Sequence, residues 1–211
     1  MAPYKTYSYD IFDTCLVRAC GSCMAVYDLM AKSVLGAGKG DGSLCPDFVT
    51  ERCAAELRAR KKLIHGKKEE VTLEEIYEEC DFSAFTSMPK RVIMQVELEI
   101  EKAVLMPVRE IKKEIDGLHA QGQCILFVSD TYLPEGFLRD VLTMHGLFKD
   151  GDALFVSSST FKTEALGSLF RLIRKQLHVD YKAWIHKGDN RYCDFYMPQE
   201  LGIHAEHVVF R

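Results

Sequence analysis

Acidic side chains follow two apolar segments that lie far apart in this sequence. Asp10 and Asp13 stand three residues apart after a short run rich in tyrosine, and Asp189 and Asp194 follow the apolar run that ends at residue 186. Carboxylate oxygens are the ligands that hard cations such as Mg²⁺ take in proteins. If the two segments meet in the fold, their acids can hold such a cation.

Further polar residues stand at the ends of other apolar runs. Ser129 and Asp130 follow the run at 124–128, and Lys162 comes shortly after the serines at 157–159. Together with the acids they offer oxygen ligands for a cation, a hydroxyl donor and one ammonium group.

Each of these residues also has an ordinary structural interpretation. Asp10 can cap a loop, and Ser129 can cap the helix that begins near Pro134. Asp189 and Asp194 can stabilise a helix through its dipole. These interpretations stay open for each residue taken alone.

The elements that must position these residues follow an alternating pattern. Continuous apolar runs alternate with helical periodicity from residue 124 onward, and a further strand is predicted at 4–10. Such alternation predicts an α/β fold, a Rossmann-like parallel sheet with helices on both faces. In such a sheet, ligands bind at the carboxyl ends of the strands. The elements predicted here are strands at 124–128, 153–156, 182–186 and 204–210, and helices at 134–145, 164–177 and up to 201.

The stretch between the strand predicted at 4–10 and the alternating part from residue 124 onward has helical character. Apolar residues recur at helical spacing over 47–64, residues 72–75 form a capping box, and Pro89 opens a further helix. This predicts an all-helical cap inserted into the α/β unit. The predicted domains are a core of residues 1–19 and 106–211 and a helical cap insertion of residues 20–105.

Composition and charge argue against several classes of function. Of the 211 residues, 47% are hydrophobic and 27% are charged, which is typical of a globular protein. The net charge of -4 gives no basic footprint for a nucleic acid. No apolar run approaches the roughly 20 residues of a membrane span. The first residues contain no apolar signal segment, so we expect a cytoplasmic protein.

The eight cysteines are spaced irregularly, which favours reduced thiols over a disulfide framework. Cys20 and Cys23 form a CxxC pair. A structural zinc site would need two further ligands at a matching spacing, and a redox pair would need a thioredoxin-like unit. Both interpretations stay open as alternatives.

Taken in order, three motifs resemble those of the haloacid dehalogenase (HAD) superfamily of hydrolases, most of whose members are phosphatases. The motifs are residues 10–14, the strand that ends at Ser129, and residues 188–194, and the resemblance covers nearly the whole chain. The chain also resembles, more narrowly, a bacterial branch found near or fused to glycosyltransferases of surface-polysaccharide synthesis. This implies a glycosyltransferase as partner or fused domain. The segments that resemble this branch are 9–18, 71–77 and 128–134.

The resemblance implies a nucleophile and a metal site. Asp10 would be the nucleophile that forms an aspartyl-phosphate. Asp10, Asp189 and the backbone oxygen of Phe12 would hold Mg²⁺, with Asp194 as a further ligand or just behind it.

The resemblance also implies contacts with a phosphorylated substrate. Ser129 would donate to a phosphate oxygen, and Lys162 would offset the remaining negative charge. Asp130, Arg18 and Asn190 complete the predicted substrate contacts. For Arg18 an ion pair with an acid of the cap is the alternative.

The chain departs from the motifs of the superfamily at two positions. Most of its phosphatases carry a second Asp two residues after the nucleophile, which protonates the leaving group. Phe12 stands there instead, and Asp13 follows one place later, where glycine is frequent. The resemblance also expects a lysine at the position of Glu164, so Lys162 or Lys187 would have to supply the ammonium.

We therefore expect a Mg²⁺-dependent hydrolase of small phosphate monoesters, with a sugar phosphate or glycan precursor suggested by the narrower branch. Two alternatives remain. A dehalogenase-type hydrolase would explain Phe12 but not Asp189, because that chemistry needs no metal. A catalytically weak domain that binds a phosphorylated ligand and serves a glycosyltransferase would explain both departures.

Overall fold

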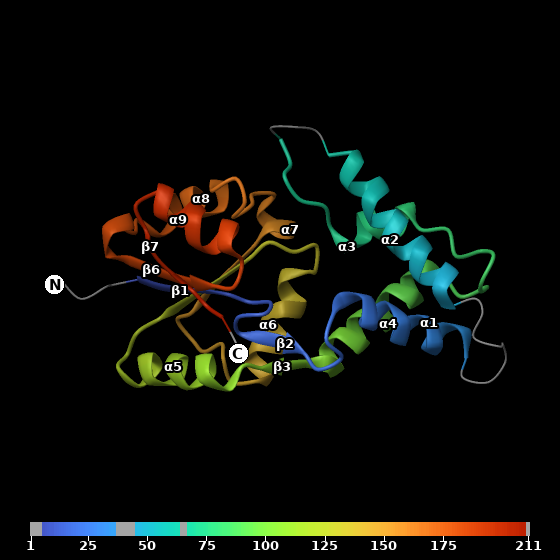
Figure 1. The fold of residues 1–211 in the computed structure, drawn as a ribbon, viewed down its shortest axis with the longest axis horizontal. Coiled ribbons are helices and arrows are strands. Elements are labelled where there is room, and N and C mark those ends of the chain that lie inside the picture. Colours follow the sequence, from blue (N-terminus) through green and yellow to red (C-terminus); the bar gives the residue numbers. More distant parts are fainter. Residues whose placement is uncertain (1–5, 37–44, 64–66, 210–211) are drawn as a thin grey trace.

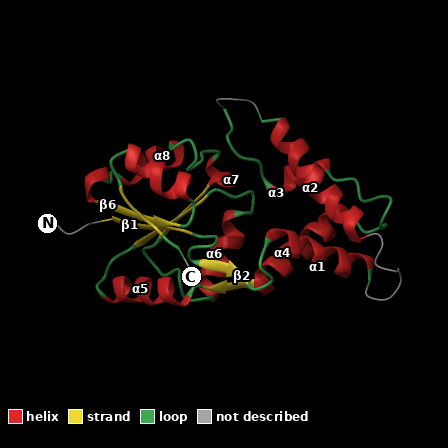
Figure 2. Ribbon diagram, viewed as in Figure 1, coloured by secondary structure: helices red, strands yellow, loops and turns green. Residues whose placement is uncertain are grey.

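The structure, a computed structural model, describes residues 6–36, 45–63 and 67–209. Residues 4, 5, 64 and 210 of the predicted elements lie outside these ranges. A five-stranded sheet forms the centre, in the order β5-β4-β1-β6-β7, and all neighbouring strands are parallel (Figures 1 and 2). This confirms the predicted α/β fold. The strands are β1 (Thr6–Asp10), β4 (Ile125–Ser129), β5 (Ala153–Val156), β6 (Trp184–Gly188) and β7 (His204–His207).

Helices cover both faces of the sheet (Figure 1). Successive residues of β4 point to opposite faces, so Phe127 belongs to the hydrophobic cluster under α5 and α6, whereas Val128 belongs to the cluster under α8. None of the helices in the described ranges is long and apolar enough to cross a membrane. The helical elements of this part are α5 (Arg109–Ala120), α6 (Glu135–Met144), α7 (Ser157–Thr160), α8 (Ser168–Leu177), the 3₁₀ turn η1 (Tyr181–Ala183), the π-helix η2 (Arg191–Tyr196) and α9 (Met197–Glu200).

Four helices of the described residues form a separate layer beside the sheet, between β1 and β4 in the chain (Figure 1). The capping box at the start of α3 is confirmed, since Thr72 Oγ1 accepts from Glu75 N at 3.3 Å and Thr72 N donates to Glu75 Oε2 at 2.9 Å. The chain enters and leaves this layer through an antiparallel pair of short strands. The elements are β2 (Leu16–Arg18), α1 (Cys23–Leu35), α2 (Cys45–Lys61), α3 (Leu73–Glu79), α4 (Lys90–Val104) and β3 (Leu105–Pro107).

Candidate active site

The carboxyl ends of two neighbouring strands bring three acids together. Asp10 is the last residue of β1, and Asp189 and Asp194 follow β6. One carboxylate oxygen from each of the three lies within 4.8 Å of the others. Asp10 and Asp194 are buried, and Asp189 is half-buried. Such a set of oxygens can hold a hard divalent cation.

The π-helix η2 turns Asp194 back toward the end of β6. The Asn190 side-chain oxygen accepts from Tyr192 N at 2.9 Å and Cys193 N at 3.1 Å, which starts this helix. Asn190 N donates to Asp194 Oδ2 at 2.8 Å. The second oxygen, Asp194 Oδ1, is buried and has no hydrogen-bond partner among the described residues. Asn190, predicted to contact the substrate, therefore uses its side-chain oxygen as a helix cap.

Burial and mutual repulsion raise the pKa of the clustered acids. The pKa of Asp10 lies well above its ordinary value because the carboxyl is buried and faces Asp194 and Asp189. The pKa of Asp189 is raised by burial and by Asp194 and Asp13. Two like charges about 4 Å apart cost roughly 4 kcal/mol at an effective dielectric constant near 20. A cation between these carboxylates would remove that cost, so the donor set and its charge fit a divalent metal.

The three acids line a cavity of about 210 Å³, which also receives side chains from the end of β4 and from the loop before α8. Among the described residues that line it, six are acidic and none is lysine or arginine. Most of the predicted site residues are therefore brought together. The residues that line the cavity are Asp10, Phe12, Asp13, Ser129, Asp130, Glu164, Asp189, Asn190, Cys193 and Asp194.

The loop after β1 presents Phe12 and Asp13 at this cavity. Asp13 is exposed and has a φ of 55°, in the left-handed region, and its N–H donates to Leu16 O at 2.8 Å. Glycine adopts this conformation freely, and Asp and Asn tolerate it better than most other residues. The backbone thus explains why a glycine in the resembling motifs can be replaced by Asp13.

Arg18 lies outside the cavity-lining set and contacts the helical layer. Its Nε and Nη2 donate to the buried Glu101 carboxylate of α4 at 2.9–3.1 Å. Its guanidinium carbon lies 4.6 Å from the centroid of the Phe12 ring. The guanidinium therefore makes the ion pair that the sequence left open as the alternative to a substrate contact.

Both lysines proposed for the phosphate are engaged elsewhere in the structure. Lys162 Nζ lies 2.9 Å from Glu69 Oε1, in the segment before α3. Lys187 Nζ lies 2.7 Å from Glu114 of α5 and 2.7 Å from Glu206 of β7. Neither residue lines the cavity.

Glu164, which stands where a lysine was expected, is buried at the cavity. Asp130 fixes the loop that carries it: its carboxylate accepts from Glu164 N at 2.8 Å and Ala165 N at 3.1 Å. Burial raises the pKa of Asp130 to about 6. Burial and the charges of Asp194 and Asp130 hold the pKa of Glu164 well above its ordinary value. Asp130, predicted to contact the substrate, thus positions a further acid.

The sequence did not predict Glu164 or His186 as residues of this region. For Glu164 the signal was a carboxylate at the position of an expected ammonium. For His186 it was one polar residue in an apolar strand, two positions before Gly188. His186 is the last residue of the strand predicted at 182–186, and one of its two ring nitrogens has no hydrogen-bond partner among the described residues.

Comparisons with protein-family models and with curated proteins find no match. Comparison with solved structures finds several proteins of similar fold. One is YfnB of Bacillus subtilis, named as a HAD hydrolase and bound to magnesium: 15% identity over 95% of this chain and 86% of that chain, TM-score 0.62.

Two further neighbours represent two activities. The first is a HAD phosphatase of Thermococcus onnurineus, with 17% identity, covering 94% of this chain and 83% of that chain, at a TM-score of 0.60. The second is the L-2-haloacid dehalogenase of Xanthobacter autotrophicus with chloropropionic acid covalently bound, with 11% identity, covering 94% and 75%, at a TM-score of 0.62. At these identities the comparisons establish the fold alone.

Proposed function

We propose that this chain, which has the fold of the haloacid dehalogenase superfamily, is a Mg²⁺-dependent hydrolase of small phosphate monoesters. The observation that carries this proposal is the convergence of Asp10, Asp189 and Asp194, with one oxygen of each within 4.8 Å of the others. The magnesium bound to the Bacillus neighbour supports the choice of ion. The phosphatase from Thermococcus supports the choice of reaction.

In the proposed reaction, one carboxylate oxygen of Asp10 attacks the phosphorus atom, and the alcohol leaves with a proton. Water then hydrolyses the aspartyl-phosphate, which restores the Asp10 carboxylate and releases inorganic phosphate. Asp10, Asp189, Asp194 and the backbone oxygen of Phe12 would hold Mg²⁺, which when bound offsets the repulsion between the carboxylate and the phosphate. Ser129 would donate a hydrogen bond to a phosphate oxygen.

Asp13 is our proposed source of the proton for the leaving alcohol. It lines the cavity, it is exposed, and Phe12 occupies the position at which the resembling phosphatases carry their acid. A general acid must come within hydrogen-bond reach of the leaving oxygen. Asp13 would therefore have to come within that reach of the leaving oxygen when the substrate binds.

The helical layer, residues 20–105, is proposed to act as a cap that limits the substrate to small molecules. Contacts between the helical layer and the loop before α8, which carries Glu164, support this proposal. Glu69 accepts from Thr163 N at 2.9 Å and pairs with Lys162. Sugar phosphates are the first substrates to test, because of the resemblance to the glycosyltransferase-associated branch.

A second proposal is a domain that binds a phosphorylated ligand with little turnover. The absence of lysine and arginine from the described cavity lining favours it, because nothing but the metal would offset the phosphate charge. Phe12 favours it too, since an aromatic ring cannot protonate a leaving group.

Phosphate release from an aryl phosphate tests these proposals. We expect release that requires Mg²⁺, stops with a chelator, and is abolished by Asp10→Asn. Asp140→Asn, the same chemical change on an exposed side chain of α6, is the control and should leave the rate unchanged. Activity that survives Asp10→Asn would contradict the assigned nucleophile.

Two other outcomes would replace the first proposal. Thermal stabilisation by phosphate plus Mg²⁺ without turnover would support the binding domain. Chloride release from a 2-haloacid without metal would support a dehalogenase-type hydrolase, the alternative that the Phe12 position allows. A panel of phosphorylated metabolites then identifies the substrate.

A further inference from the structure

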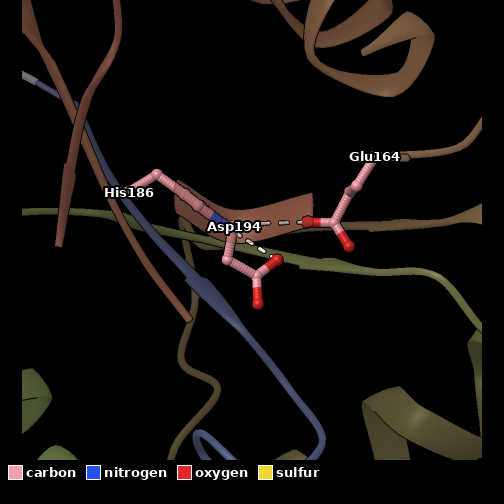
Figure 3. Close-up of side chains that lie close together, drawn as sticks. All are labelled: Glu164, His186 and Asp194. Carbon is pink, nitrogen blue, oxygen red and sulfur yellow. Dashed lines mark ion pairs between the residues drawn. The ribbon is translucent and has the colours of Figure 1, made fainter. Parts of the chain in front are cut away.

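Three buried polar atoms face one another beside the Asp10 cluster, and none has a hydrogen-bond partner among the described residues. They are Glu164 Oε1, His186 Nε2 and Asp194 Oδ1. The three residues are 1%, 0% and 1% exposed. Figure 3 shows that both carboxylates lie at the same end of the imidazole, with dashed lines from the ring nitrogen to one oxygen of Glu164 and one of Asp194. Because each buried polar atom without a partner costs about 1–3 kcal/mol, the arrangement favours a ligand that satisfies all three.

The distances leave room for an ion. His186 Nε2 lies 3.8 Å from Glu164 Oε1 and 3.6 Å from Asp194 Oδ1, which is too long for hydrogen bonds. One ligand atom from each of the three residues lies within 4.8 Å of the others. Ligands bound at about 2.1 Å to a tetrahedral ion are about 3.4 Å apart, so small side-chain shifts would complete such a site.

We infer that Glu164, His186 and Asp194 form a second metal site, which binds a divalent transition-metal ion such as Zn²⁺. One imidazole nitrogen and two carboxylate oxygens suit an ion of this class, whereas Mg²⁺ binds through oxygen. Asp194 belongs to both sets of metal-binding residues. Its side chain would therefore bridge the second ion and the ion proposed at Asp10 and Asp189.

The surroundings of His186 hold its ring for this role. Its Nδ1 lies 2.7 Å from Ser8 Oγ, the residue directly opposite in the β1–β6 pairing. Trp184 Nε1 donates to the same Ser8 oxygen at 2.7 Å, and the Phe170 ring packs edge-on with its centroid 5.0 Å from that of His186. A ring that donates from Nδ1 to Ser8 offers its Nε2 lone pair to a metal, as metal-binding histidines do.

The charge of the site supports a second cation. Six acids line the cavity, and one divalent ion offsets two of their charges. Glu164 places a further carboxyl group beside Asp194, and no lysine or arginine of the described lining would offset its charge when a bound cation favours the ionised form. The second site shares Asp194 with the proposed Mg²⁺ site, but it does not depend on phosphate hydrolysis.

Crystals of metal-free protein soaked with Zn²⁺ and Mg²⁺ test the inference. We expect an anomalous difference peak at the zinc absorption edge between the Glu164, His186 and Asp194 side chains. Zn²⁺ titration by calorimetry should show a site whose affinity falls about 100-fold or more in Glu164→Gln. A map of the wild-type protein with no peak there overturns the inference. That result is expected if Ser8 instead donates to Nδ1 and Nε2 keeps its proton.

Two further variants separate this inference from the proposed function. Asp10→Asn should abolish turnover and keep the zinc peak, whereas Glu164→Gln should lose the peak. Ser8 would contact no metal itself. Ser8→Ala should nevertheless lower the Zn²⁺ affinity about 10-fold or more, because the imidazole of His186 would no longer be held in place. Unchanged Zn²⁺ affinity in Glu164→Gln contradicts the site. If Glu164→Gln does not fold, the wild-type map decides.

Discussion

The Asp194 carboxylate lies directly against the backbone of Gly188, the last residue of β6. A Cβ added to Gly188 would come within 2.3 Å of the Asp194 carboxyl carbon. Atoms cannot approach that closely, so a side chain at position 188 must displace Asp194. Gly188 is thus required for close approach, and its φ lies outside the left-handed region.

Gly188→Ala should therefore damage the metal site more than the fold. We expect Mg²⁺ affinity to fall about 10-fold or more and the free energy of unfolding to fall by about 1–3 kcal/mol. Gly117→Ala in α5 is the control, because its Cβ meets nothing within 4 Å and should raise stability by about 0.5–1 kcal/mol. For both variants, calorimetry measures the Mg²⁺ affinity and urea denaturation measures the free energy of unfolding. Normal Mg²⁺ binding by Gly188→Ala would contradict the close contact.

Asp13→Asn tests the proposed general acid without disturbing the loop, because Asn also tolerates the left-handed conformation that Asp13 adopts. We expect hydrolysis of alkyl phosphates to slow about 10²-fold or more. Hydrolysis of an activated aryl phosphate should change little, since its leaving group needs no proton. Asp13→Gly, which relaxes the backbone, should show the same difference between substrates. Equal rates for wild type and Asp13→Asn on poor leaving groups would exclude Asp13.

A buried ion pair joins α2 and α4 in the helical layer. Arg52 Nε and Nη2 donate to the Glu97 carboxylate at 2.8 Å, and both side chains are fully buried. Tyr77 OH donates to the same carboxylate at 2.7 Å. Arg52→Met should lower the free energy of unfolding by about 3–5 kcal/mol, because it leaves Glu97 charged and unpaired.

The double variant Arg52→Met/Glu97→Leu is the control for this pair. It should cost less than the sum of the two single changes, because it removes both charges together. Urea denaturation of the four proteins completes the cycle. If the loss of stability in the double variant equals the sum of the two single losses, the two charges do not stabilise each other.

The raised pKa of Asp130, about 6, predicts how stability depends on pH. Between about pH 4 and pH 6 the folded protein keeps a proton at Asp130 that the unfolded chain has lost, so this group makes the fold less stable as pH rises. Two pKa units correspond to about 3 kcal/mol at most. The buried Asp10 and Glu164 act in the same direction, because their pKa values are also raised.

Urea denaturation of the metal-free protein across this interval measures the effect. Asp130→Asn should make the loss of stability with rising pH less steep, and saturating Mg²⁺ should do the same by favouring the ionised acids. A variant whose stability follows the wild-type pH profile would show that Asp130 titrates at its ordinary value.

Local patterns were enough to predict the sheet and several helix starts, since α4 begins directly after Pro89 and α6 directly after Pro134. The capping box at residues 72–75 depends on side chains three positions apart, and it appears as predicted. Helix α1 was not predicted. The strands β2 and β3 were not predicted either, because strands of three residues carry no periodic signal. Strand β6 begins two residues later than predicted, since Asp180 caps a 3₁₀ turn over Tyr181–Ala183.

The amino-acid sequence by itself determined which polar residues stand at the carboxyl ends of strands, because strand alternation is a local property. The tertiary structure decided which charges meet. Lys162 forms an ion pair with Glu69, and Lys187 forms ion pairs with Glu114 and Glu206. Glu164 lies beside His186. Ion pairing and burial depend on partners from distant segments, and no spacing within one segment encodes them.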